Sequence, residues 1–213
     1  NIYPGSLLPA VPANKYQHKM NKVRNIIFLL ITSAIMALSS CDGKKEVIIN
    51  TWFGEIHVAL DLQNAPVTSA NFLRYVDAGL FDSACFYRVV RPDNQQNDSI
   101  RIAVIQGGRY NQEETGGFPP IAHETTEMTG IRHLNGTISM ARWTPGTATS
   151  EFFICVGDQP ELDYGAKRNP DGQGFAAFGQ VTKGMDVVMK IHSIEAPAQY
   201  LDKPILIYSI KRK

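Results

Sequence analysis

Residues 151–156 read EFFICV, an apolar run that opens with a single carboxylate. In a β-strand, successive side chains point to opposite faces of the sheet. Phe152, Ile154 and Val156 would therefore share one face, and Phe153 would lie on the other. We expect the first face to belong to the core. The ring of Phe153 on the second face then needs a ligand or, as the simpler alternative, a cover of helix or loop.

Short strand-like segments flank this run on both sides. They are apolar, or alternate between apolar and polar residues, at 47–49, 55–60, 84–90, 100–106, 136–141, 175–181 and 205–210. One helix is predicted to begin at Pro66, whose fixed φ suits a first helical turn, and to end at Gly79. A second helix covers 185–192. Two helices among seven or eight strands favour an antiparallel barrel or sandwich over a βαβ array.

Two polar side chains interrupt the apolar strands. Arg88 lies inside FYRVV at 86–90, and Gln106 ends a neighbouring run. Alternation places Val104 and Gln106 on one face of their strand, and Gly107 frees the backbone just beyond. An arginine on a strand is more often a solvated surface residue, so the pattern alone leaves the role of Arg88 open.

Taken together, these segments resemble the cyclophilin family of peptidyl-prolyl cis-trans isomerases. FYRVV resembles the family's Phe-His-Arg-Ile-Ile segment. The other matching elements are IQGG at 105–108, SMA at 139–141, SEFFI at 150–154, FGQV at 178–181, GMDVV at 184–188 and the helix start APVTSANF at 65–72. The similarity runs from Val47 to the C-terminus in the family's own order.

The resemblance implies a mainly β fold, a closed antiparallel eight-stranded barrel capped by two α-helices, over residues 47–213. It also implies a surface groove that binds an Xaa-Pro peptide. Position by position, Arg88 matches the family's catalytic arginine. Gln106 matches the glutamine that holds the peptide backbone, and Phe153 matches the floor of the proline pocket.

Further groove positions follow from the same resemblance. Ala141 matches a contact to the peptide backbone, and Leu162 matches a wall of the pocket. Val104, Arg142 and Phe175 also line the expected groove, but they differ from the residues that are usual in the family, as does Ala103. We therefore expect a pocket of altered shape.

Glu151 is the departure with the largest expected effect, because the family usually has glutamine there. A carboxylate near Arg88 could pair with the guanidinium and compete with a bound peptide. On this hypothesis, Glu151→Gln raises activity.

The expected activity is acceleration of Xaa-Pro rotation in exported or unfolded client proteins, which assists their folding. The alternative is a catalytically weak module that binds proline peptides, or a membrane-tethered chaperone. No cofactor is expected, and the histidines show no zinc-type spacing. With 21 basic and 20 acidic side chains scattered along 213 residues, no nucleic-acid partner is expected, and a monomer is the default.

The N-terminal part of the chain predicts export. Residues 20–40 have basic residues followed by the apolar run 26–38, which is too short to span a bilayer but typical of a signal peptide. Leu-Ser-Ser-Cys at 38–41 resembles a bacterial lipobox, which implies cleavage before Cys41 and its acylation. The alternative is an uncleaved anchor with an ordinary thiol.

The domain plan follows from these signals. We expect residues 1–19 to be a disordered extension outside the biological product, and residues 41–46 to be a tether from the lipidated cysteine. The protein would then be anchored to a membrane of the bacterial envelope, with its domain in the periplasm or outside. Cys85 and Cys155 are expected to be buried thiols, with a disulfide between them as the alternative.

Overall fold

The computed structural model describes residues 44–96, 98–110 and 116–213. These residues belong to the second of two compact units, Gly43–Lys213. The predicted signal peptide and the lipidation site at Cys41 lie outside the described residues. No helix in the described ranges is long and apolar enough to cross a membrane.

Eight strands and three α-helices make up the described chain. The strands are β1 (Lys44–Thr51), β2 (Gly54–Asp61), β3 (Cys85–Val90), β4 (Val104–Gly108), β5 (Thr137–Met140), β6 (Phe152–Cys155), β7 (Ala176–Lys183) and β8 (Tyr200–Arg212). The helices are α2 (Pro66–Asp77), α3 (Thr126–Thr129) and α4 (Met185–His192), with short 3-10 turns η1 (Pro92–Asn94) and η2 (Pro160–Leu162).

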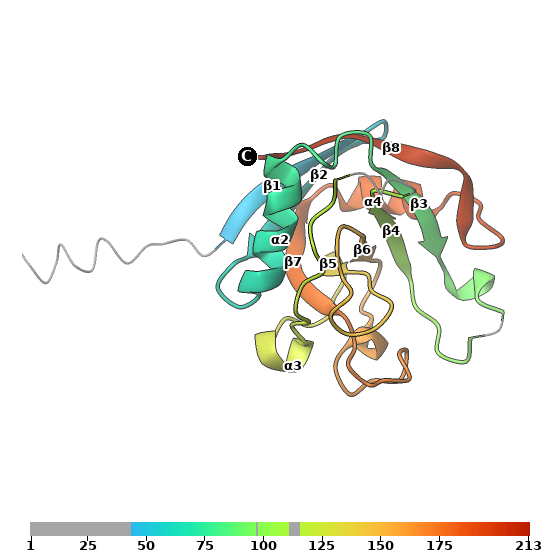
Figure 1. Ribbon diagram of the computed structural model, residues 1–213. Helices are drawn as coiled ribbons and strands as arrows, with labels where there is room; N and C mark the ends of the chain where they lie inside the picture. Colours follow the sequence, from blue (N-terminus) through green and yellow to red (C-terminus); the bar gives the residue numbers. More distant parts are fainter. Residues whose placement is uncertain (1–43, 97, 111–115) are drawn as a thin grey trace, which may run out of the picture. The chain divides into compact units, whose positions relative to one another are not determined.

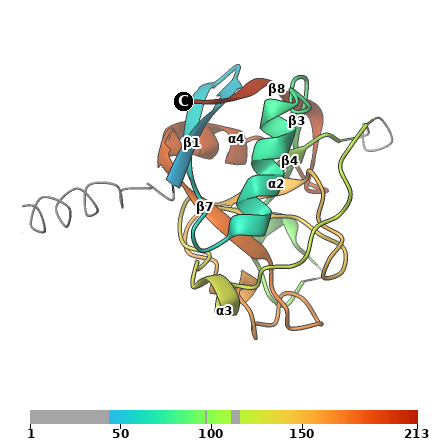
Figure 2. The same ribbon diagram turned by 60° about the vertical axis from the view of Figure 1, so that its left-hand side comes forward.

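The strands close into one antiparallel barrel in the order β1-β2-β7-β5-β6-β4-β3-β8. Closure depends on β8, which pairs with β1 on one side and β3 on the other. Figure 1 shows β8, in red, running beside β1, in blue. Helix α2 packs beside β2, β7 and β8, and helix α4 packs beside β2, β3 and β4 (Figure 2). The expected eight-stranded barrel is thus confirmed, with the one-turn helix α3 in addition to the two expected helices.

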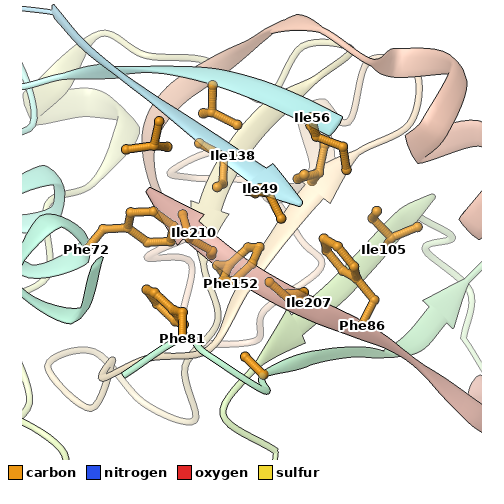
Figure 3. Close-up of a cluster of buried hydrophobic side chains, with 14 of the residues drawn as sticks. Ile49, Ile56, Phe72, Phe81, Phe86, Ile105, Ile138, Phe152, Ile207 and Ile210 are labelled. Carbon is orange, nitrogen blue, oxygen red and sulfur yellow. The ribbon is translucent and has the colours of Figure 1, made fainter. Parts of the chain in front are cut away.

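The core contains aromatic rings from the barrel and from α2 (Figure 3). The ring of Phe72, on α2, lies 5.4 Å from that of Phe152 in an edge-to-face arrangement, and 5.3 Å from that of Phe178. Such pairs add to the free energy gained from apolar burial. The prediction that Phe152 and Ile154 face the core is confirmed, since both are fully buried in this cluster.

The start of α2 is held by a residue far away in the chain. Pro66 occupies the first helical turn, as predicted. The carboxylate of Glu124 accepts hydrogen bonds from the backbone N–H groups of Val67 (3.1 Å) and Thr68 (2.8 Å). A carboxylate at this end of a helix satisfies otherwise unpaired N–H groups and interacts favourably with the helix dipole.

Cys85 and Cys155 are both free thiols. Cys85 pairs with Gly108 at one end of β4, and Cys155 pairs with Val104 at the other end. Strands are about 4.8 Å apart and rise about 3.4 Å per residue, so these sulfurs are much farther apart than a disulfide permits. The disulfide alternative is wrong, and the expected thiols are present, with Cys155 buried and Cys85 half-buried.

Candidate active site

Three adjacent strands bring the predicted catalytic residues into one row. Arg88 on β3 pairs with Gln106 on β4, and Gln106 pairs with Phe153 on β6. All three line an open cavity of about 780 Å³ on the outside of the barrel. The same strands that fill the core with one face therefore build the cavity with the other.

The remaining groove residues predicted from the sequence also line this cavity. They are Val104, Ala141, Arg142, Glu151, Leu162 and Phe175. Gly107 follows Gln106 because the neighbouring strand leaves no room for a side chain. A Cβ on Gly107 would lie 2.8 Å from the carbonyl oxygen of Cys85.

The guanidinium of Arg88 is fixed by two amide oxygens. Nη1 donates to Oε1 of Gln106 (3.0 Å), and Nε donates to Oε1 of Gln199 (3.1 Å), which also accepts from Nη2. The guanidinium also lies 5.9 Å from the ring centre of Tyr200. Burial lowers the pKa of Arg88 from its ordinary value, which is so high that the side chain stays charged in proteins. These bonds use three of the five N–H groups that a guanidinium carries, so further N–H groups remain as donors.

Beside this cation lies an apolar hollow. Phe153, only 4% exposed, meets Phe175 edge to face at 5.2 Å and stacks on His133 at 5.9 Å. Leu162 and Ile102 pack in the same cluster. The predicted cover for Phe153 therefore exists on two sides, while the ring still faces the cavity.

A buried histidine, His133, packs against Phe153, the predicted floor of the proline pocket. The imidazole of His133 is bonded through Nδ1 to the carboxylate of Asp163 (2.8 Å) and through Nε2 to the hydroxyl of Ser139 (3.0 Å). Burial alone would raise the pKa of Asp163, but its hydrogen bonds with His133 hold it below its ordinary value. His133 is thus fixed at both ring nitrogens beneath Phe153, which limits how far that ring can move.

Arg142 forms a wall of the hollow. Its guanidinium lies 5.3 Å from the ring centre of Phe175 and is bonded to both carboxylate oxygens of Asp171 (2.8 and 3.0 Å) and to the carbonyl of Gly174. The hydrogen bond from Arg142 lowers the pKa of Asp171. With its side chain 1% exposed and paired, Arg142 shapes the pocket.

The carboxylate of Glu151 accepts a 2.6 Å hydrogen bond from the hydroxyl of Tyr87. That hydroxyl accepts in turn from Nε2 of Gln106 (2.7 Å). The geometry thus connects Glu151 to Gln106 through Tyr87, whereas the guanidinium of Arg88 has amide partners. Competition between Glu151 and peptide for Arg88 stays a prediction.

Several cavity residues were missed from the sequence. Tyr87, Tyr110, Tyr200 and Trp143 line the cavity, and Gln199 holds Arg88. Tyr87 is adjacent to Arg88 in FYRVV, so the sequence did carry a signal for it. Gln199 gives no local signal, because only barrel closure through β8 brings it to β3.

Among the described residues, no group of three or more His, Cys, Asp or Glu side chains could hold a metal ion. The site residues that the structure brings together supply a fixed guanidinium, an amide and an apolar hollow.

The chain belongs to the cyclophilin type peptidyl-prolyl cis-trans isomerases, whose family model matches residues 46–212. Peptidyl-prolyl cis-trans isomerase A of Dickeya dadantii is 35% identical over 194 residues, which cover 87% of this chain and 94% of that protein. Peptidyl-prolyl cis-trans isomerase B of Escherichia coli is 32% identical over 70% of this chain and 84% of its own length.

The fold is similar to that of solved members. A cyclophilin type isomerase of Cryptosporidium parvum superposes with a TM-score of 0.64 at 20% identity, over 80% of this chain and 98% of that one. At this identity the likeness shows the fold alone. A second structure of that protein, obtained in the presence of the dipeptide Ala-Pro, gives a TM-score of 0.63.

Proposed function

We propose that the cavity binds a proline-containing stretch of a polypeptide and that Arg88 accelerates rotation of its Xaa-Pro bond. The observation that carries this proposal is a fixed cation beside an apolar hollow. Family membership supports the reaction, and the use of Ala-Pro with the Cryptosporidium parvum relative supports proline peptides as the ligand class.

The mechanism follows from amide resonance. Rotation about an Xaa-Pro bond meets a barrier of roughly 18–20 kcal/mol, because the nitrogen lone pair is shared with the carbonyl. In the twisted state the lone pair is localised on nitrogen and can accept a hydrogen bond. Arg88 would donate to it there, an interaction that the planar ground state scarcely offers. Meanwhile Phe153 and its neighbours would hold the prolyl ring still, and Gln106 would hold the peptide backbone.

The magnitudes are compatible with this role. A thousand-fold acceleration requires lowering the barrier by about 4 kcal/mol. One preorganised donor in a water-poor site contributes on the order of 3–4 kcal/mol. Because Gln106 and Gln199 already fix the guanidinium, little free energy is spent on ordering it during the reaction.

Replacing Arg88 tests the proposal. Exchange spectroscopy on a proline peptide should show wild-type turnover, a kcat about 100-fold lower in Arg88→Ala, and peptide binding retained. Arg88→Lys is the matched control, since it keeps the charge but not the planar set of donors, and should be intermediate. Equal turnover in wild type and Arg88→Ala would contradict the role of Arg88. Peptide binding without turnover in wild type would instead indicate a binding module or a tethered chaperone.

We further propose that acyl chains on Cys41 hold the protein on a membrane of the cell envelope, where its clients are exported or unfolded chains. The support is the sequence, with a signal-like run 26–38 before Leu-Ser-Ser-Cys. Each buried methylene contributes about 0.8 kcal/mol, so several chains anchor firmly. Labelled fatty acid should enter the wild-type protein and not Cys41→Ala. Unlabelled wild type would contradict the proposal.

A further inference from the structure

A continuous row of hydrogen bonds crosses the active site and includes residues outside the expected catalytic set. From one end to the other, its side chains are Gln199, Arg88, Gln106, Tyr87 and Glu151. The amide of Gln106 lies at the centre. Its oxygen faces Arg88 and its nitrogen faces Tyr87.

The chemistry at each side of Gln106 fixes the orientation of its amide. A guanidinium only donates, so Arg88 requires the amide oxygen. A carboxylate only accepts, so the proton of the Tyr87 hydroxyl goes to Glu151, and the hydroxyl oxygen remains to accept from Nε2 of Gln106. If the amide were turned by 180°, its NH₂ group would face the N–H groups of Arg88. The carboxylate thus selects one of two orientations through the tyrosine.

Tyr87 is held firmly enough to transmit this preference. Tyr87 is 6% exposed, and its ring stacks on that of Tyr110 with centres 4.2 Å apart and planes 15° apart. Burial first, and then the charge of Glu151, raises the pKa of Tyr87 far above its ordinary value. The hydroxyl therefore keeps its proton at any physiological pH, and the ring cannot swing away without losing its stacking contact.

We infer that Tyr87, anchored by Glu151, is a positioning residue that holds Gln106 in the orientation that accepts from Arg88. Without the hydroxyl, the amide of Gln106 is released to rotate, and Arg88 loses a fixed acceptor on one side. Hydrogen bonds in such a row also strengthen one another in a site of low dielectric. The inference rests on the proposed function, because the benefit of a fixed guanidinium appears in the rate of isomerisation.

The test is Tyr87→Phe, which keeps the ring and its stacking and removes only the hydroxyl. Exchange spectroscopy on a proline peptide should show kcat about ten-fold lower, with KM changed less than two-fold, because one aligned hydrogen bond is lost in the rotating state. Tyr208→Phe is the matched control, since Tyr208 lies exposed on β8, and it should leave both values unchanged.

A second measurement does not depend on turnover. The side-chain ¹⁵NH₂ signal of Gln106, identified by its loss in Gln106→Leu, should move in Tyr87→Phe and stay in place in Tyr208→Phe. An active wild type with an unchanged kcat in Tyr87→Phe overturns the inference and leaves the proposed function standing. An inactive wild type overturns the proposed function, and the Gln106 signal then decides whether Tyr87 positions the amide.

Discussion

Two arginines of one cavity have different partners, and the difference assigns them different roles. Arg142 is bonded to both oxygens of the Asp171 carboxylate, which neutralises its charge. Arg88 is bonded to the amide oxygens of Gln106 and Gln199, which orient the guanidinium without neutralising it. Because an uncompensated cation in a partly buried site attracts developing negative charge more strongly, Arg88 suits the rotating bond.

At the same scale, the variant Glu151→Gln separates two hypotheses, because one predicts a rise in activity and the other predicts a fall. If Glu151 competes with peptide for Arg88, the substitution raises kcat/KM. If Glu151 anchors Tyr87, the new amide can present its NH₂ group to the hydroxyl and release Gln106. We expect the second outcome, a fall in kcat of a few-fold. In the Tyr87→Phe background this fall should largely disappear, because the two residues act through one bond. A rise in kcat/KM in the single variant contradicts this expectation.

At the scale of elements, the strands were predicted more reliably than their ends. Helix α4 spans Met185–His192 as predicted, because its apolar periodicity and its flanking residues indicate the same bounds. Strand β4 begins at Val104 instead of residue 100. The reason is the side chain of Gln95, which donates to the carbonyl of Ile102 and accepts from its N–H group. The backbone of Ile102 is therefore bonded to a side chain and not to a neighbouring strand.

In the candidate site, too, contacts between residues far apart in the sequence were not predicted. Alternation along single strands placed Val104 and Gln106 on one face and Phe153 on the face opposite the core, and the resemblance placed them in a groove. All three line the cavity. Gln199, the second partner of Arg88, could not be predicted, since it is 111 residues away in sequence and has no motif of its own. Its backbone adopts a φ of 69°, which is uncommon for a residue other than glycine, and its carbonyl accepts from the N–H group of Val89. Contacts of this kind depend on closure of the whole barrel.

At the scale of the whole molecule, the shifted pKa values predict lower stability in acid. Burial lowers the pKa of His123 and His192, so the unfolded chain binds more protons below about pH 6.5. Among the described residues, five carboxylates also have lowered pKa values, those of Glu46, Asp77, Asp93, Asp163 and Asp171. Groups with a depressed pKa in the folded state lose their stabilising contribution as pH falls through their unfolded and then folded values.

Urea unfolding at a series of pH values checks this expectation. The midpoint should fall first between about pH 7 and 5 and more steeply below about pH 4. His192→Gln is a suitable control, because glutamine can still donate to the Val90 carbonyl that the imidazole reaches at 3.0 Å but does not titrate. The variant should reduce the first phase, to which His123 still contributes, and leave the second phase unchanged. A midpoint that rises on acidification would contradict the prediction.

Cys85 on β3 and Cys155 on β6 pair with opposite ends of β4, so an oxidising environment cannot close a disulfide between them in the folded barrel. Burial raises the pKa of Cys85 to about 11 and that of Cys155 still further, so neither sulfur is an effective nucleophile near neutral pH. The barrel of the described residues therefore contains no disulfide that an oxidase or a disulfide isomerase would have to form.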